Sequence, residues 1–143
     1  FLKFSLSLSR IPTAGTTVLL VENGYLYTKQ NGSEIAYKVH YESVSNFPGT
    51  ITDISVDPNN PDNVCVVTSG TSTNHVYYST NATSSNPSFN SIDGDLPDMP
   101  VFGCIVERDP TTDVIIIGTT YGVFSTDNIA GSSTNWVSNN TEI

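Results

Sequence analysis

The sequence has few basic residues. Lys and Arg together number 5 against 14 Asp and Glu, which gives a formal net charge of −9. A chain with this charge is repelled by a phosphate backbone and by an anionic membrane surface. Nucleic acid is therefore a poor candidate as a partner, and we expect none.

Long hydrophobic runs and helical periodicity are also missing. Apolar stretches such as Val114–Ile117 fall far short of the roughly 20 residues that a membrane helix needs. No cleavable signal peptide is visible at the start, and the opening at Phe1 rather than Met leads us to expect a piece of a longer or processed polypeptide. We expect a soluble chain without membrane insertion and without a helical solenoid.

Cysteine and histidine occur only twice each. Cys65 and Cys104 lie in apolar, strand-like runs, where two buried thiols are the favoured reading and a disulfide is the alternative. His40 and His75 have no partner at the spacing of a zinc site or a nucleophilic triad, so we expect both at strand edges facing water. The sequence thus predicts no catalytic residue, no metal ligand and no cofactor.

What the chain does contain is β-strand pattern. Leu2, Phe4, Leu6 and Leu8 alternate with polar residues, which indicates a strand with one buried face. The β-branched run 17–21 ends at Asn23-Gly24, a strong hairpin signal, and the partner strand is 25–29. With 37% hydrophobic residues, such strands can build a core.

The pattern repeats about every fifty residues. Asp57-Pro58 recurs as Asp109-Pro110, Tyr78–Asn81 recurs as Phe124–Asp127, and Phe89 corresponds to Trp136. We count twelve strands in three sets of four, within approximate segments 1–46, 47–98 and 99–143.

This period is that of propeller blades, each a four-stranded antiparallel sheet that buries both faces against its neighbours. The predicted fold class is all-β, a β-propeller fragment of about three blades, with a β-sandwich as the alternative. Three blades leave two open apolar faces, so we expect further blades of the same chain, or of a second copy, as partners.

The segment Tyr121–Asn128, followed by Trp136, resembles an Asp-box of the BNR-type repeat, Ser-x-Asp-x-Gly-x-x-x-x-Trp. The resemblance implies a structural role for Ser125, Asp127 and Trp136, with the Asp capping a turn and the Trp packing into the blade. The chain departs from the motif in one respect, because Asn128, Ile129 and Ala130 separate Asp127 from Gly131, where the motif has a single residue.

The other two segments depart further from the motif. The middle segment has Asn81 for the Asp and Phe89 for the Trp, and the first has Lys29 and Gln30 where the box would be. Proteins with such boxes include sialidases, xyloglucanase-like glycosidases, sortilin-type receptors and secreted bacterial surface proteins. The motif alone does not distinguish among these functions, because a fold does not imply a function.

Sialidase chemistry is disfavoured, because it relies on an arginine cluster and only Arg10 and Arg108 are present. A glycosidase needs two carboxylates flanking a sugar, and Asp53 with Glu107 is the only pair within first strands, which we weigh below an ordinary solvated role. The acidic loop 93–98 could hold calcium, although an ordinary turn is favoured. Tyrosines could stack on sugars, but packing between blades explains most of them.

The sequence therefore predicts a non-catalytic propeller module of a secreted or cell-surface protein, which binds a protein or glycan or holds an assembly together. The alternative is part of a glycoside hydrolase whose catalytic residues lie outside this stretch. Glycosylation-like triplets at Asn31, Asn81 and Asn139 favour the extracellular location.

Overall fold

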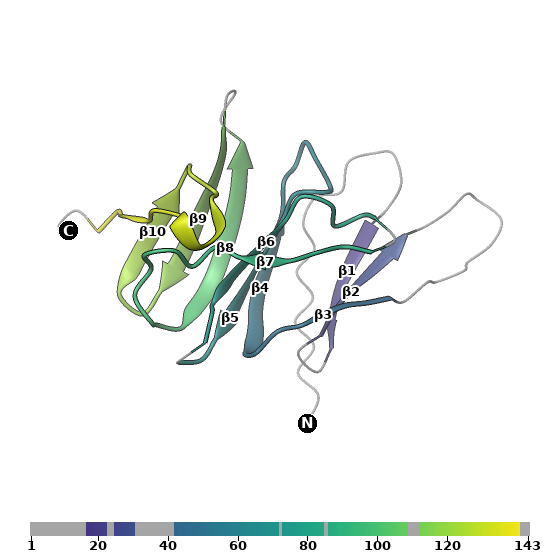
Figure 1. Cartoon of the computed structure of the whole chain (residues 1–143), viewed down its shortest axis with the longest axis horizontal. Helices are drawn as coiled ribbons and strands as arrows, with labels where there is room; N and C mark the ends of the chain where they lie inside the picture. The colour runs from purple at the N-terminus through teal and green to yellow at the C-terminus, as the bar shows by residue number, and fades with distance from the viewer. Residues whose placement is uncertain are drawn as a thin grey trace.

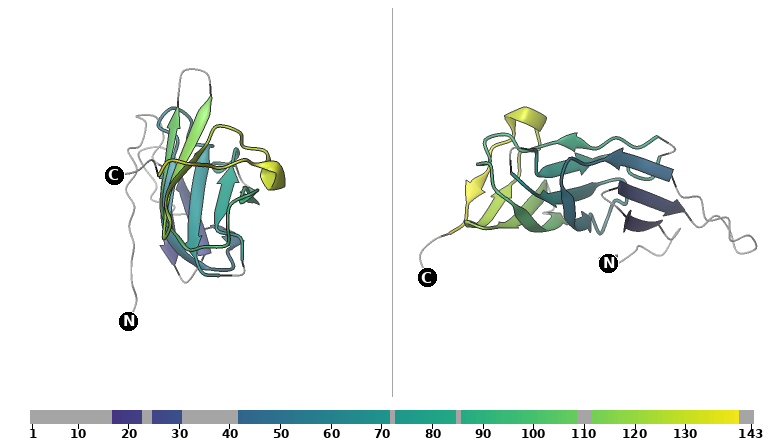
Figure 2. Two further views of the ribbon diagram at one scale, coloured as in Figure 1. Left: turned by 90° about the vertical axis from the view of Figure 1, so that its left-hand side faces the viewer. Right: turned by 90° about the horizontal axis from the view of Figure 1, so that it is seen from below.

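The computed structural model describes residues 17–22, 25–30, 42–71, 73–84, 86–108 and 112–140. These segments form three antiparallel sheets that lie side by side in a row, with the last sheet at one end and the first at the other (Figure 1, Figure 2). The only helical element among them is a short 3-10 turn, η1 (Gly131–Ser133). No helix in the described part of the chain is long and apolar enough to span a membrane.

The first sheet, sheet A, contains three strands in the order β1-β2-β3. Glu22 lies opposite Tyr25 in the ladder between β1 and β2, which confirms the hairpin predicted at Asn23-Gly24. The strand expected at residues 2–8 and the one expected at 36–41 lie outside the described residues. The bounds are β1 (Thr17–Glu22), β2 (Tyr25–Gln30) and β3 (Glu42–Asn46).

Sheets B and C are four-stranded meanders in which each strand pairs with the next along the chain. The turn between β4 and β5 contains the Asp57-Pro58 pair of the sequence repeat, and proline cannot donate to a ladder. Sheet B comprises β4 (Thr50–Val56), β5 (Val64–Ser69), β6 (Val76–Ser79) and β7 (Asn90–Ser91). Sheet C comprises β8 (Val101–Arg108), β9 (Asp113–Thr119), β10 (Gly122–Thr126) and β11 (Val137–Ser138).

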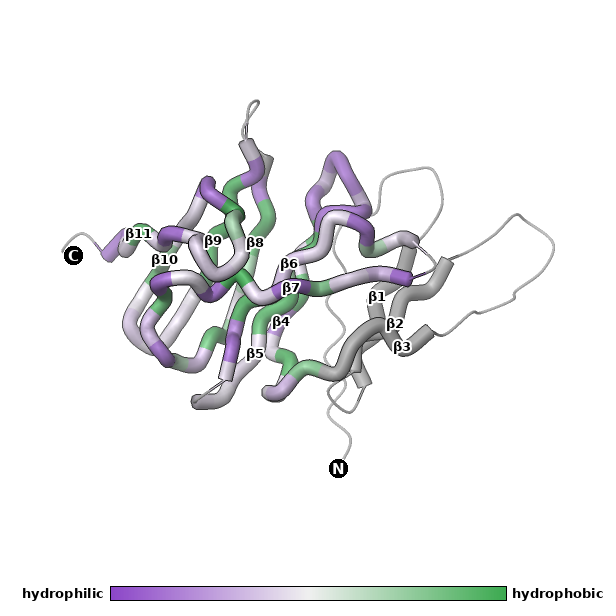
Figure 3. The backbone as a smooth tube through the Cα atoms, viewed as in Figure 1, coloured by the Kyte–Doolittle hydropathy of each residue, from purple (hydrophilic) through white to green (hydrophobic). Residues whose placement is uncertain are grey.

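Sheet B is buried on both faces. Cys65 and Val67 face sheet C and share an apolar cluster with Ile115 and Ile117. Val66 points the other way, into a second cluster that includes Phe47. This explains why β5 is hydrophobic without alternation, and the apolar colouring of β5, β8 and β9 in Figure 3 follows the same packing.

Sheet C meets sheet B through its end strand, β8, which packs on β4 and β5. The Cys104 N–H donates to Asp53 Oδ2 at 3.0 Å, and the Val106 N–H donates to Ser55 Oγ at 2.9 Å. Thr52 Oγ1 donates to the Val101 carbonyl at 2.7 Å. Short side chains of β4 thus satisfy the backbone groups along the β8 edge, which otherwise need another strand or water.

The all-β prediction is confirmed for the part of the chain that the structure describes. Both four-stranded sheets are antiparallel, and each falls within one of the segments expected from the repeat. The described sheets form an open row, not a closed barrel (Figure 1).

The packing between sheets B and C predicts unequal costs for two isoleucines of sheet C. Ile115 is 0% exposed and faces sheet B, whereas Ile105 is 57% exposed on the opposite face. Ile115→Ala should lower the free energy of unfolding by about 3 kcal/mol, because it leaves a cavity. Ile105→Ala, the control, should change it by less than about 1 kcal/mol. Equal losses in urea denaturation would contradict the assignment of the two faces.

Candidate functional site

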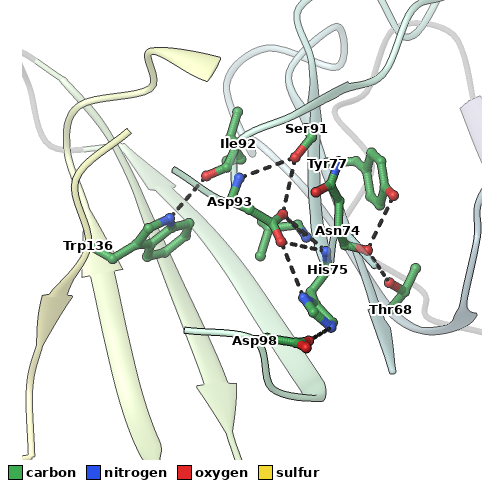
Figure 4. A network of polar contacts seen from close by, with 10 residues as sticks. Thr68, Asn74, His75, Tyr77, Ser91, Ile92, Asp93, Asp98 and Trp136 are labelled. Carbon is green, nitrogen blue, oxygen red and sulfur yellow. Dashed lines mark hydrogen bonds and ion pairs between the residues drawn. The ribbon is translucent and has the colours of Figure 1, made fainter. Parts of the chain in front are cut away.

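A network of polar contacts lies where the loop after β7 passes the start of β6. His75, just before β6, meets Asp93 and Asp98 of the loop, and Trp136 of sheet C closes one side (Figure 4). The network combines a histidine, two carboxylates and a hydroxyl, the groups that commonly carry catalysis. Its geometry decides whether they do.

Asp93 is the centre of the network. Oδ1 accepts hydrogen bonds from the Val76 N–H at 2.8 Å and the His75 N–H at 3.0 Å, and Oδ2 accepts from the same His75 N–H at 2.8 Å. The Ser91 hydroxyl donates to Oδ1 at 3.2 Å and accepts from the Asp93 N–H at 3.3 Å. A carboxylate used in this way closes a turn on its own backbone neighbours.

His75 is buried, with 1% of its surface exposed, so the expectation that it faces water is wrong. Its Nδ1 lies 3.2 Å from Asp93 Oδ2, and its Nε2 lies 3.4 Å from Asp98 Oδ1 without hydrogen-bond geometry. Asp93 holds the backbone at position 75, and this places the imidazole beneath the loop (Figure 4). His40 lies outside the described residues.

The arrangement does not form a nucleophilic triad. In such a triad the imidazole lies between the hydroxyl and the carboxylate, whereas Ser91 Oγ contacts Asp93 and not His75. Among the described residues, no hydroxyl or thiol forms a hydrogen bond with the imidazole Nε2. The network can hold the loop, but it lacks the geometry to activate a nucleophile.

The acidic loop spreads its carboxylates over three partners. Asp95 Oδ1 accepts from the Trp136 N–H at 2.7 Å, while Asp93 binds the start of β6 and Asp98 lies beside His75. Within the described part of the chain, no three acidic, His or Cys side chains converge as metal ligands. The loop therefore links sheets B and C.

The carboxylates weighed as a glycosidase pair point in different directions. Asp53 accepts from the Ile54 and Cys104 N–H groups in the interface between the sheets. Glu107 is exposed on β8 and follows Val106, which is buried toward sheet B. Because successive side chains of a strand alternate between faces, Glu107 lies on the opposite face of sheet C from Asp53.

The residues assigned to the Asp-box take different environments. Trp136 is buried, and its Nε1 donates to the Ile92 carbonyl at 3.0 Å. Ser125 Oγ accepts from Asn139 Nδ2 at 2.7 Å. Asp127 is exposed, and its carboxylate forms no hydrogen bond with the described residues.

The turn after β10 is instead closed by the neighbouring residues. Thr126 Oγ1 accepts from the Asn128 N–H at 3.1 Å and donates to the Asn128 carbonyl at 3.3 Å. After β6, Ser79 Oγ likewise accepts from the Asn81 N–H at 3.1 Å. The hydroxyl-x-Asn turn therefore falls one residue later in sheet C than the sequence alignment of the two segments predicts.

The strand registers align sheets B and C residue by residue. A bulge follows Ile51 in β4 and Val101 in β8. When the sheets are aligned on these bulges, the cross-strand pair Val67–Val76 of sheet B corresponds to the pair Gly118–Val123 of sheet C. The alignment equates Phe89 with Trp136, as the sequence repeat predicts.

The same alignment identifies a repeated polar cap that the sequence analysis missed. Asn140, 47 positions after Asp93, accepts from the Val123 N–H at 2.8 Å, just as Asp93 accepts from Val76. Ser138 stands where Ser91 does, and its hydroxyl accepts from Asn140 Nδ2 at 2.9 Å. The detectable signal was Ser-x-Asp recurring as Ser-x-Asn.

Gly122 takes the place of His75 in sheet C. Its φ of +110° favours glycine, and a Cβ there would overlap the Asn140 side chain. The repeated cap therefore has a histidine in sheet B and a glycine at the equivalent position in sheet C.

Two tyrosines of β6 are buried, as the packing interpretation predicts. The Tyr77 hydroxyl donates to the Asn74 carbonyl at 3.2 Å, and the Tyr78 hydroxyl donates to Asp113 Oδ2 of sheet C at 3.1 Å. Burial, with a smaller effect of Asp93, raises the pKa of Tyr77 to about 12. Burial and Asp113 also raise the pKa of Tyr78. Tyr121, by contrast, is 70% exposed at the turn between β9 and β10.

Comparison of the chain with protein-family models, curated proteins and solved structures gave no match.

The role of Asp93 predicts graded effects of substitution. Asp93→Ala should lower the free energy of unfolding by about 3 kcal/mol, because it leaves the buried Val76 N–H without its acceptor. Asp93→Asn should lower the free energy of unfolding by only about 1 kcal/mol, because the amide oxygen of Asn140 accepts the equivalent backbone hydrogen bond in sheet C. Asp127→Ala, the control, should stay within about 0.5 kcal/mol. If Asp127→Ala cost as much as Asp93→Ala in urea melts, Asp127 would be the turn cap after all.

The raised pKa of Tyr77 predicts a loss of stability at alkaline pH. The neutral phenol is favoured in the folded state, so its contribution is full below pH 10 and is lost as the pH rises toward 12. Phenylalanine at position 77 cannot ionise, so the free energy of unfolding of Tyr77→Phe should fall less steeply than that of wild type between about pH 10 and 12. Tyr121→Phe, at an exposed position, is the control for removal of a tyrosine hydroxyl. Parallel curves for Tyr77→Phe and wild type would refute this role of Tyr77.

Proposed function

We propose that this chain is part of an Asp-box-type β-propeller and serves as a non-catalytic binding or assembly module of a secreted or cell-surface protein. The observation that carries the proposal is the repetition of sheet B in sheet C, strand by strand and bulge by bulge. Propellers are built from four-stranded antiparallel sheets repeated in this manner.

The mode of packing also supports a propeller. The first strand of sheet C lies on the first two strands of sheet B, so each sheet presents one face to the next. In a sandwich of two sheets each sheet buries one face, whereas sheet B buries both of its faces. Further sheets of the same kind would extend the row.

The polar network supports a non-catalytic role. Asp93 and Asp95 bind backbone N–H groups, and His75 is buried. Such bonds stabilise turns. The glycoside hydrolase alternative requires catalytic carboxylates from outside this stretch.

The outer face of sheet C supports a role in binding or assembly. Phe102, Ile105, Val123 and Val137 are exposed on β8, β10 and β11, and contiguous apolar patches of this kind mark interaction sites. By the strand registers, Phe102 and Ile105 correspond to Thr52 and Ser55, which contact sheet C from sheet B. We infer that another sheet of the same repeat, in the same or a neighbouring chain, covers this face.

Self-association of the isolated chain tests the proposal. Sedimentation velocity should reveal oligomers of the wild-type chain. The double variant Phe102→Thr/Ile105→Ser carries the residue types of sheet B at these positions. It should raise the dissociation constant of the oligomer about tenfold. Tyr121→Ser, which removes an exposed aromatic ring at the end of the sheet, should leave it unchanged. A monomeric wild type would contradict the proposed docking face. Release of sugar from a panel of polysaccharides by the longer polypeptide that contains this chain would instead favour the glycoside hydrolase alternative.

A further inference from the structure

The two cysteines lie on facing surfaces of sheets B and C. Cys65 is on β5 and fully buried, and Cys104 is on β8 and nearly so. Both belong to the same apolar cluster, and Cys104 Sγ donates to the Cys65 carbonyl at 3.8 Å. Both thiols are free in this structure.

Sheets B and C approach each other closely beside the two cysteines. A disulfide needs Cα atoms about 4.4 to 6.8 Å apart, which sheets packed at the usual spacing of about 10 Å do not allow. Here the Cys104 N–H reaches Asp53 Oδ2, and the Val106 N–H reaches Ser55 Oγ. The backbone of β8 therefore lies within one short side chain of β4, in which Ser55 pairs with Cys65 of β5.

The repeat itself does not call for cysteine at these positions. By the strand registers, Ile116 of sheet C corresponds to Cys65, and Ile54 of sheet B corresponds to Cys104. An isoleucine thus satisfies the equivalent position in the other sheet in both cases. The chain has cysteine instead at two positions that belong to the same cluster between the sheets.

We propose that Cys65 and Cys104 form an inter-sheet disulfide when the chain folds in the presence of a small disulfide such as oxidised glutathione. One cysteine thiolate attacks oxidised glutathione and releases one glutathione thiolate, which leaves a mixed disulfide. The second cysteine, as its thiolate, attacks the protein sulfur and releases the second glutathione. One sulfur–sulfur bond breaks, one forms, and two electrons pass to glutathione.

The reaction belongs to folding and not to the finished native state. The neighbouring Cys65 thiol and burial raise the pKa of Cys104, and only the thiolate attacks a disulfide. The exchange therefore occurs while the strands are still accessible. This inference does not depend on the proposed propeller function.

Refolding in a redox buffer tests the proposal. Wild type is refolded from urea with reduced and oxidised glutathione, quenched with acid, alkylated after denaturation and weighed intact. We expect a product lighter than the reduced chain by two hydrogen atoms, with no alkylated cysteine. Its Tm should exceed that of the dithiothreitol-reduced form by about 10 °C, since the bridge joins positions 39 residues apart.

Single variants supply the matched controls. Cys65→Ile and Cys104→Ile, which place the residue of the other sheet at each position, should each yield one alkylated cysteine or one glutathione adduct and never a bridged monomer. Wild type that keeps two alkylatable thiols or carries glutathione would overturn the proposal, as would a bridged form that melts below the reduced one. The double variant Cys65→Ile/Cys104→Ile, followed by circular dichroism, separates these results from a failure to fold.

Discussion

The capping of the β8 edge by side chains of β4 is the interaction on which the rest of the structure depends. Asp53 and Ser55 accept hydrogen bonds from the β8 backbone, and Thr52 donates to it. Each such bond contributes only about 1 kcal/mol net, but an unpaired strand edge that is buried costs more. The bonds set how closely the sheets approach, and so which side chains share the core and why the two cysteines meet.

A second constraint governs the turns. Strands as short as β7 and β11 contribute few ladder bonds, so polar side chains must satisfy the backbone at the ends of their neighbours. Asp93 and Asn140 perform this task in sheets B and C. A histidine flanked by carboxylates would suggest catalysis from composition alone, but here Asp93 binds the backbone at the start of β6. The outer face of sheet C exposes apolar side chains, and we propose it as the surface that a partner covers.

Much of the fold could be predicted because its signals are local. Alternation, β-branched runs and turn residues predicted an all-β chain with sets of four strands, and the spacing of Phe89 and Trp136 matched the structural repeat. The site was predicted less well. The environment of His75 depends on Asp93, 18 residues away, and no pattern around the histidine itself reports that contact. The assignment of Ser125 and Asp127 rests on an alignment that the strand registers shift by one residue.

What the sequence determined by itself was an acidic, all-β chain with a period near fifty residues, because net charge, side-chain alternation and turn propensity are properties of neighbouring residues. What only the tertiary structure decided was which polar groups are buried and which face remains open. Bulges after Ile51 and Val101 and unequal loops change the pairing register, and a change of one residue moves a side chain to the other face of its sheet. The capping of β8 and the approach of Cys65 to Cys104 follow from that register.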